Sequence, residues 1–261
     1  MVITCFFLIC LASFSQAYVI ETTPYCSMKQ YTVTQVGIQS NSGSVVVRGR
    51  HRALSALDYV NERYYTNYTL SVLDSTGKTL TIGYELIVDV PNGANYVIQN
   101  GECRKYRLPE QLQSSFTPCL NGVMIPESTS YNLGGFKGSP NAIKEETFRM
   151  NLDVTDGENE GMTGQLWLSY AKNPDDPETY LLLKEEMLGS LQLSESSELI
   201  SFSSEYVDYE IGVDEKRFNI PQDCPEEFDE GNFNGHNRYR RSLSTKSFQA
   251  ARYAALKLLT P

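Results

Sequence analysis

The sequence predicts a mostly β protein with minor α structure, built as one strongly curved antiparallel sheet with an apolar face. Short runs rich in β-branched and aromatic residues recur along the chain, and clusters of Gly, Asn and Pro separate them. Aromatic residues make up 11% of the chain and its acidic residues are dispersed, which indicates a packed core rather than disorder. Consecutive antiparallel strands joined by short turns usually lie side by side, so we expect a half-barrel or barrel.

The strand pattern can be followed through most of the chain. Residues 31–38 alternate and are rich in β-branched side chains, and residues 74–78 indicate a hairpin turn between two longer runs. Residues 109–116 could form one or two helical turns, and residues 128–140 have the composition of a loop. The expected strands cover residues 31–38, 44–47, 64–72, 79–90, 96–98, 104–108, 147–154, 164–170, 180–183 and 201–211.

Residues 1–17 have the pattern of a secretory signal peptide. Residues 2–14 are almost entirely apolar, and Ser15-Gln16-Ala17 places small residues at the two positions that matter for cleavage. The apolar run is shorter than the roughly 20 residues that a spanning helix needs. We therefore expect cleavage after Ala17 and an extracellular, secreted chain without a transmembrane segment.

Four cysteines follow the expected cleavage position. An even number of cysteines in an oxidising compartment predicts two disulfides, and four cysteines allow three pairings. The sequon Asn67-Tyr68-Thr69 predicts an N-glycan on Asn67 and a surface position for that segment. The four cysteines are Cys26, Cys103, Cys119 and Cys224.

The composition changes after Cys224, so we expect the β domain to cover residues 18–224. Residues 225–241 pass from acidic to basic and predict a linker, and residues 242–261 form a separate tail. The linker ends in Arg238-Tyr239-Arg240-Arg241, a furin-type sequence, so cleavage there would release the tail as a peptide. An exposed basic stretch is equally typical of a solvated linker, and the attached tail could form an amphipathic helix.

Five segments in the second half of the chain follow one another in a recognisable order. They are Thr147–Leu152, Gly164–Pro174, Glu185–Ser190, Tyr206–Tyr209 and Phe218–Cys224, which has the form Phe-x-x-Pro-x-x-Cys. In these segments the chain resembles the extracellular LolA-like domains of animals and the ependymin-related family. It is also similar to the N-terminal segment of certain insect cathepsin-type proteinases. An earlier element, Asn100-Gly101-Glu102-Cys103, fits the ependymin-related pattern of a hairpin followed by a cysteine.

This resemblance, over about residues 26–224, implies an open half-barrel around a hydrophobic cleft that loops or short helices plug. It implies binding of a lipid or other apolar ligand, and it does not imply catalysis. The pairing Cys103–Cys224 fits these families best, with Cys26–Cys119 as the second pair. The chain departs from them in having no cysteine near residues 187–190 or near Glu146.

The sequence contains no combination of residues that is typical of an enzyme. Nucleophilic catalysis normally needs a base beside a serine or cysteine. His51 lies between two arginines on an expected strand end or loop, and His236 lies in the linker. Oxidised cysteines leave no thiolate, and no glycine-rich segment has the phosphate-loop pattern. We expect a non-enzymatic protein without a cofactor.

Net charge and the spacing of possible metal ligands indicate which partners and metals the chain is not expected to bind. The formal net charge of −10 disfavours nucleic acid, because phosphate backbones repel an acidic chain. No cysteine and histidine spacing predicts a zinc site. Asp153, Asp156 and Glu158 surround one turn and are weak candidates for calcium ligands, since charged hairpin tips are normally just solvated.

Apolar side chains of the expected strands are the candidates for lining a ligand cleft, and ordinary sheet packing explains the same pattern. The leading hypothesis is a secreted protein that binds a lipid or other hydrophobic molecule in a half-barrel cleft. One alternative is an extracellular matrix or secreted-fluid interaction protein with a plugged cleft, whose partner would be a matrix component or a second copy of the chain. Another alternative is a precursor of the C-terminal peptide. The candidate ligand-binding residues are Tyr84, Leu86, Val88, Val97, Phe148, Met150, Leu166 and Leu168.

Overall fold

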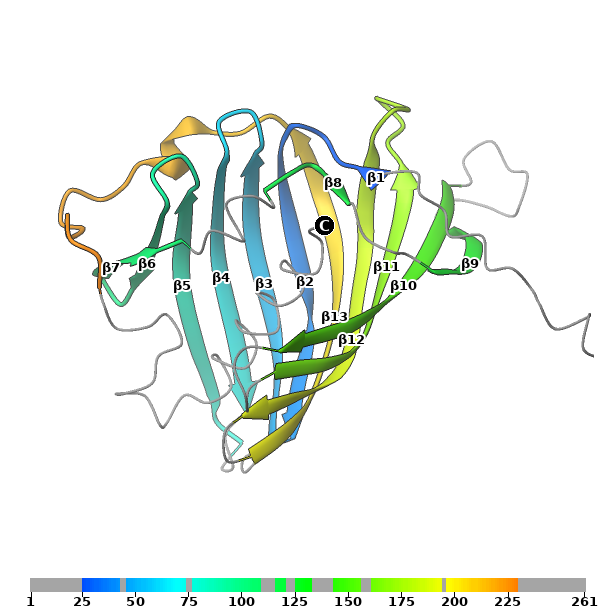
Figure 1. Ribbon diagram of the computed structural model, residues 1–261, viewed down its shortest axis with the longest axis horizontal. Helices are drawn as coiled ribbons and strands as arrows, with labels where there is room; N and C mark the ends of the chain where they lie inside the picture. The colour runs from blue at the N-terminus through cyan, green and yellow to red at the C-terminus, as the bar shows by residue number, and fades with distance from the viewer. Residues whose placement is uncertain are drawn as a thin grey trace, which may run out of the picture.

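The computed structural model describes residues 25–42, 46–73, 77–108, 116–120, 125–132, 143–155, 161–193 and 196–229. Most of these residues lie in β-strands (Figure 1). Two short strands, β1 (Tyr25–Cys26) and β8 (Cys119–Leu120), pair with each other, and the others form one sheet. The strands of that sheet are β2 (Gln30–Ser42), β3 (Val46–Asp58), β4 (Arg63–Leu73), β5 (Thr79–Asp89), β6 (Ala94–Gln99), β7 (Glu102–Arg107), β9 (Ile125–Asn132), β10 (Ile143–Thr155), β11 (Gly161–Lys172), β12 (Tyr180–Leu193) and β13 (Ser196–Ile211).

The sheet consists of two meanders that meet at its centre. Strands β2 to β7 follow one another toward one end of the sheet, and β13 back to β9 follow one another toward the other end. The two meanders join where β13 pairs antiparallel with β2, which places Phe202 opposite Gln39. The order across the sheet is therefore β7-β6-β5-β4-β3-β2-β13-β12-β11-β10-β9.

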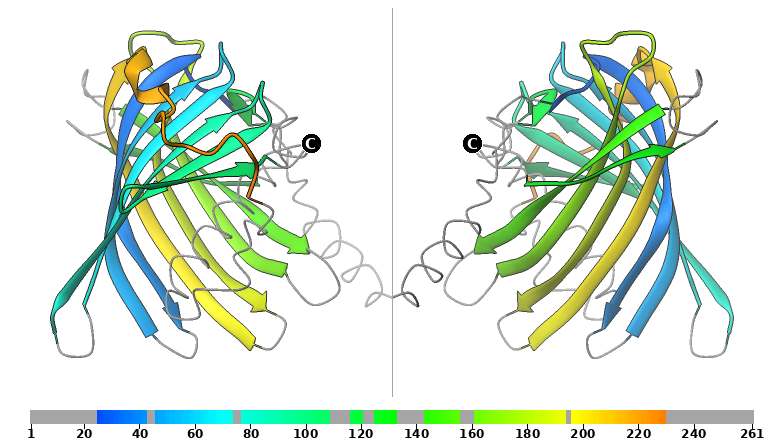
Figure 2. Two further views of the ribbon diagram at one scale, coloured as in Figure 1. Left: turned by 90° about the vertical axis from the view of Figure 1, so that its left-hand side faces the viewer. Right: turned by 90° about the vertical axis from the view of Figure 1, so that its right-hand side faces the viewer.

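The sheet curves strongly but does not close, as the two side views in Figure 2 show. Its end strands in the described chain, β7 and β9, each pair with a single neighbour and not with one another. Sheets twist because of strand sterics, and bulges next to Phe148 and Tyr170 bend the second meander further. The predicted mostly β class and curved, unclosed antiparallel sheet are confirmed.

Alternation along the strands gives the sheet two faces. We call the concave face, on whose side β1 and β8 lie, the inner face, and the opposite one the outer face (Figures 1 and 2). Residues that are directly opposite one another on paired strands lie on the same face, so the register identifies the inner-face residues of each strand. Met150 is opposite Leu166, Leu166 is opposite Met187, and Met187 is opposite Phe202. All four side chains are buried, so the main core lies on the inner face.

A C-terminal arm, residues 212–229, covers one part of the outer face. It contains the 3₁₀ turn η1 (Glu215–Phe218). Phe218 packs into an outer-face apolar cluster that includes Tyr65, and a disulfide joins Cys224 of the arm to Cys103 of β7. The other disulfide, Cys26–Cys119, joins β1 to β8. The structure thus has the pairing that the family resemblance implies.

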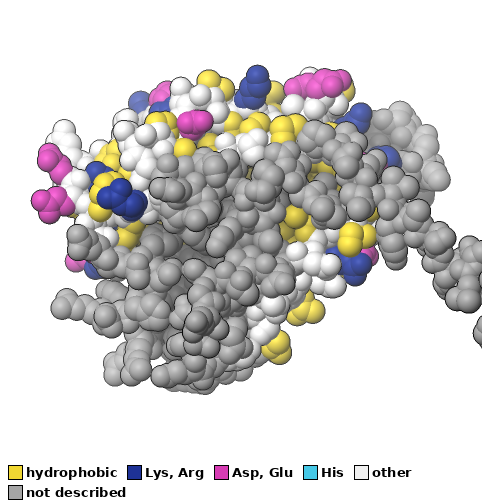
Figure 3. Space-filling view, viewed as in Figure 1, with side chains coloured by type: hydrophobic (Ala, Val, Ile, Leu, Met, Phe, Trp, Pro, Cys, Tyr) yellow, Lys and Arg dark blue, Asp and Glu magenta, His cyan; other side chains and the backbone are white. Residues whose placement is uncertain are grey.

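The arm continues past Cys224 along the edge strand β7. The backbone amide of Asp229 donates to the carbonyl of Lys105 at 2.7 Å. The ring of Phe228 lies 4.7 Å from Lys105 Nζ and 4.6 Å from Arg107 Cζ. Figure 3 shows basic and hydrophobic side chains together at this edge. Residues 225–229, which the sequence assigns to the start of a linker, therefore lie against the sheet.

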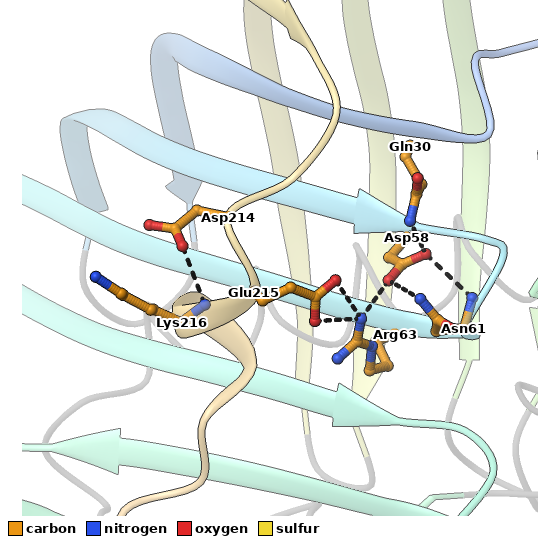
Figure 4. A network of polar contacts seen from close by, with 7 residues as sticks. All are labelled: Gln30, Asp58, Asn61, Arg63, Asp214, Glu215 and Lys216. Carbon is orange, nitrogen blue, oxygen red and sulfur yellow. Dashed lines mark hydrogen bonds and ion pairs between the residues drawn. The ribbon is translucent and has the colours of Figure 1, made fainter.

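A polar network ties the arm to the turn between β3 and β4 (Figure 4). The Asp58 side chain is completely buried and accepts hydrogen bonds from Gln30, Asn61 and Arg63. Arg63 also forms an ion pair with Glu215 of η1 at 2.9 Å. Burial raises the pKa of Asp58, but the hydrogen bonds outweigh burial and lower the pKa to about 2. Asp58 is therefore a buried carboxylate, stabilised by its donors.

The largest differences from the expected strands are in β3, β9 and β12. β9 includes residues 128–132, which the sequence assigns to a loop. β12 continues to Leu193 rather than ending at residue 183, and β3 continues to Asp58 rather than ending at residue 47. Charged and polar residues occupy the outward positions of β3 and β12, and one face of an antiparallel sheet can carry them in solvent. A prediction based on runs of apolar residues misses these strand segments because of their charged and polar residues.

Other expectations lie outside the described residues. These are the leader with Ala17, the helical turns at residues 109–115, the calcium candidates Asp156 and Glu158 with the side chain of Asp153, and the processing sequence with Arg238, Arg240 and Arg241. In the part of the chain that is described, no helix has the length and apolar character to cross a membrane.

Candidate ligand-binding face

The inner face carries one apolar cluster to which both meanders contribute. Strands β3 to β5 supply one side, and β10 to β13 supply the other. Each fully buried large apolar side chain contributes about 1.5–3 kcal/mol through removal from water, so this cluster dominates the stability of the sheet. Its buried members are Tyr25, Ala53, Tyr68, Leu70, Tyr84, Phe148, Met150, Leu166, Leu168, Tyr170, Met187, Ile200 and Phe202.

The structure places most of the candidate ligand-binding residues in this cluster. Five of them are buried members, and Leu86 is partly buried and packs against the cluster. Val88 and Val97 are partly buried and lie outside the cluster. Cross-strand register still places them on the inner face, because Val97 is opposite Leu86. The five buried members are Tyr84, Phe148, Met150, Leu166 and Leu168.

One end of the cluster is occupied by Tyr25 from β1. Its ring centroid lies 4.7 Å from that of Phe148, 5.4 Å from that of Tyr170 and 4.6 Å from that of Tyr180. Such offset and edge contacts between aromatic rings are favourable beyond their buried area. The β1–β8 pair, held by Cys26–Cys119, thus inserts an aromatic side chain of the protein itself into this end of the inner face.

A strip of polar groups crosses the centre of the inner face. Tyr68 donates to Gln39 at 3.0 Å, and the Nε2 atom of His51 lies 3.0 Å from Ser204 Oγ. Farther along, Tyr206 donates to the buried carboxylate of Glu185 at 2.6 Å. We call these three pairs, from β2, β3, β4, β12 and β13, the polar strip. It lies among the apolar side chains of the inner cluster, where the two meanders join.

Glycine at position 37 makes the contact between His51 and Ser204 possible. Gly37 of β2 is opposite His51 of β3 on one side and Ser204 of β13 on the other. A β-carbon at position 37 would lie 2.7 Å from His51 Cε1 and 2.8 Å from Ser204 Cα, closer than real β-carbons come. The absent side chain therefore leaves the gap across which the imidazole reaches the hydroxyl.

The side chains of the polar strip form hydrogen bonds in the apolar surroundings of the inner face. A histidine nitrogen 3.0 Å from a serine oxygen has the geometry of a base beside a nucleophile. Ser204 is completely buried within the sheet, however, and buried polar groups ordinarily form such pairs. Burial raises the pKa of Tyr170 well above the usual 10, and the Glu185 carboxylate raises it further, so Tyr170 stays neutral.

Sequence reasoning missed the polar strip because it treated His51 as part of a strand end or loop. That interpretation was wrong, because His51 lies in the middle of β3 and is buried. The signal was nevertheless present in the sequence. Arg48, Arg50 and Arg52 alternate with the residues between them, and on a strand this period of two places His51 on the face opposite the arginines.

The structure also places the predicted glycosylation site. Asn67 is exposed on the outer face of β4, a position that a glycan can occupy. Among the described residues, no three His, Cys, Asp or Glu side chains come close enough together to hold a metal ion.

Comparisons with known proteins give the following findings. No family model matches the chain, and the curated proteins yield no match either. Among solved structures, the chain is similar to the crystal structure of a LolA superfamily protein from Nitrosomonas europaea, at 11% sequence identity. That match covers 75% of this chain and 92% of the other chain, with a TM-score of 0.28. The described residues themselves define the class: a β protein with an apolar concave face and a central polar strip.

Proposed function

We propose that the protein is secreted, is not an enzyme, and binds a lipid or another hydrophobic ligand on its inner face. The observation that carries this proposal is the apolar cluster, which extends over the inner face from β5 to β10. Ligand pockets are concave and mostly apolar, with a few polar groups that orient the ligand. The inner face combines these two features.

The polar strip indicates an amphipathic ligand rather than a pure hydrocarbon. Tyr68, His51 and Glu185 carry hydrogen-bonding groups in the middle of an otherwise apolar floor. A fatty acid or monoacyl lipid has the matching arrangement, with a polar head and an apolar chain. The chain would lie along one meander while the head group approaches the strip.

Export is supported by the covalent chemistry of the chain. Disulfides persist in oxidising compartments and are rare in the cytosol. Cys26–Cys119 joins β1 to β8, and Cys103–Cys224 joins the C-terminal arm to β7. Together with the apolar leader, they favour a protein that works outside the cell.

One observation favours a second candidate function, an extracellular interaction protein whose cleft is filled by its own side chains. Tyr25 already occupies one end of the inner face and contacts three aromatic rings there. If the rest of the face is filled in the same way, the inner face is only a core, and binding would occur elsewhere. The experiment must therefore detect ligand directly.

The test is extraction and titration of the natively purified protein. Organic extraction followed by mass spectrometry should recover a lipid in a stoichiometric amount. The delipidated protein should then take up a fluorescent fatty acid in a saturable way. A blank extract together with no uptake would overturn the proposal, and capture of a protein partner by the same material would favour the plugged cleft.

A pair of matched variants locates the site. Leu86→Gln changes a partly buried inner-face side chain, and we expect it to weaken uptake by about tenfold, since one lost apolar contact is worth roughly 1–2 kcal/mol. Leu199→Gln makes the same chemical change at an exposed position on the outer face and should bind like the wild type. Equal weakening by both variants would contradict an inner-face site.

A further inference from the structure

The outer face carries a straight stripe of three arginines on β3. Arg48, Arg50 and Arg52 occupy alternate positions, so their side chains leave the same face, and all three are exposed. Alternate residues of a strand are about 6.7 Å apart, and the stripe therefore spans roughly 13 Å. Among the described residues, no ion pair involves any of the three.

The strands on either side do not neutralise this stripe. On β2 the outward neighbours of the arginines are Val36, Ile38 and Ser40, and on β4 they are Thr69 and Ser71. Like charges on one strand face repel one another. The chain has a net charge of −10, with 32 acidic residues, yet none of them occupies these flanking positions. The stripe therefore keeps an unbalanced local charge that an anionic partner would relieve.

A depression of about 990 Å³ lies beside the stripe on the outer face. Its outward lining includes Arg48 and Arg50, Trp167, and hydroxyl groups such as those of Ser40, Ser201 and Ser203. The carboxylate in the lining, Glu186, is already paired with Lys184 at 2.9 Å. Two aliphatic side chains of the lining, Ile38 and Leu188, are 60% and 58% exposed.

The C-terminal arm leaves this part of the outer face uncovered. The arm packs on the cluster that contains Ala56, Tyr65 and Ile87, which lies toward the other end of the same strands. The outer face is thus divided into a part covered by the arm and a part with arginines, hydroxyls and an indole around a depression. The second part has the chemistry of a binding surface rather than of a core.

We propose that the arginine stripe and the adjoining depression bind an anionic polysaccharide that carries sulfate or carboxylate groups. Guanidinium groups bind such oxyanions with paired hydrogen bonds. Serine and threonine hydroxyls match the hydroxyls of sugar rings, and the Trp167 indole offers an apolar plane for a ring to contact. A lipid bilayer fits less well, because it would require a flat apolar surface, whereas here two aliphatic side chains stand among hydroxyl groups.

Heparin is the probe for the first experiment, with unsulfated dextran as the uncharged comparison. The full-length protein should be retained on heparin beads at about 0.15 M salt and released as added salt screens the contact. Replacing Arg48, Arg50 and Arg52 together by Gln should weaken heparin binding by about tenfold or more. The matched control replaces Lys29, Lys172 and Lys216 by Gln, which are exposed and lie off the stripe. That control removes the same charge and should bind like the wild type.

Trp167 provides the second readout, because it is the only tryptophan of the chain. Saturating heparin oligosaccharide should shift the tryptophan emission of the wild type and of the lysine control, but not of the arginine variant. Circular dichroism verifies that all three proteins are folded. The proposal is overturned if the wild type is not retained on heparin, if both triple variants lose binding equally, or if anionic vesicles bind and heparin does not.

Discussion

His51 Nε2 lies 3.0 Å from Ser204 Oγ, although 153 residues separate the two in the sequence. The contact crosses β2, which lies between their strands, and it is possible because position 37 of β2 is a glycine. His51 also stacks on Tyr68, with their ring centroids 5.9 Å apart. One polar pair thus links the first meander to the second at the centre of the sheet.

Replacing Ser204 by alanine tests whether this pair is structural. The change leaves His51 without its hydroxyl partner inside the core, and we expect the free energy of unfolding to fall by about 1–2 kcal/mol. Hydrolysis of a p-nitrophenyl ester should stay at the level of the wild type. A wild-type rate well above background that the Ser204→Ala variant abolishes would show instead that the pair is a catalytic dyad. Ser203→Ala, on the outer face, is the control and should change stability by less than about 0.5 kcal/mol.

Replacing Gly37 by alanine should be far more damaging than the same change at Gly83. A β-carbon at position 37 would lie 2.1 Å from the carbonyl oxygen of Ser203, which belongs to rigid backbone. At position 83 the nearest atom would be the carbonyl oxygen of Tyr68 at 3.4 Å, an ordinary contact. We expect Gly37→Ala to lower the free energy of unfolding by about 3 kcal/mol or to prevent folding, and Gly83→Ala to change it by less than about 1 kcal/mol. Chemical denaturation of the two variants compares them, and similar midpoints would contradict the described register.

The buried Asp58 should make the protein sensitive to acid. Its folded-state pKa of about 2 is below the usual 3.8, so the ionised carboxylate stabilises the fold. This contribution, about 2 kcal/mol, is fully present above about pH 4 and is lost as the pH falls toward 2. In Asp58→Asn, Arg63 loses a charged partner, and stability at neutral pH should fall by about 2–3 kcal/mol.

The measurement for Asp58 is the unfolding midpoint between pH 4 and pH 2. The wild type should lose stability more steeply over this interval than Asp58→Asn does. Glu215→Gln is the control, because Glu215 is 66% exposed and surface ion pairs contribute about 1 kcal/mol or less. Parallel curves for the wild type and Asp58→Asn would refute a role of this carboxylate in acid sensitivity.

Removing the Cys26–Cys119 disulfide should affect ligand uptake as well as stability. The double change to serine frees β1 and β8 to separate. We expect the free energy of unfolding to fall by about 2–4 kcal/mol. Tyr25 then leaves the aromatic cluster more readily, so a fluorescent fatty acid should associate faster. The matched change at Cys103 and Cys224 loosens the outer-face arm and should leave the association rate unchanged. A rate that is insensitive to the first change would contradict the expectation that Tyr25 hinders entry of the fatty acid at this end of the inner face.

The sequence predicts the strands whose apolar residues alternate clearly, and it fails where the outward residues are charged. Leu166 and Leu168 flank Trp167, and the sequence pattern alone leaves open whether the two leucines or Trp167 face the core. Cross-strand register decides it, because Leu168 is opposite Phe148, and the two leucines lie in the inner cluster. The face of the sheet that a side chain occupies is therefore set by the neighbouring strands and not by the residue itself.

Local sequence pattern could not predict the polar strip either. Gln39, His51, Ser204 and Glu185 come from four different strands, and in the sequence each has other polar residues beside it and nothing that links it to the other three. Their proximity depends on β13 pairing with β2, a long-range contact that local patterns do not encode. The disulfides are similar, because cysteine spacing allows three pairings and only the approach of β1 to β8 brings Cys26 beside Cys119.

β13 is the last strand of the described chain, so its pairing with β2 can form only late in synthesis. During synthesis the first meander is complete while the strand that will cover the open edge of β2 has yet to be made. Until β13 arrives, that edge presents unpaired amides and carbonyls next to an uncovered apolar surface, a combination that templates aggregation. Non-local strand pairing is also slow. A chain truncated before Ser196 should therefore be a stronger target for chaperones and quality control than most point variants of the complete protein.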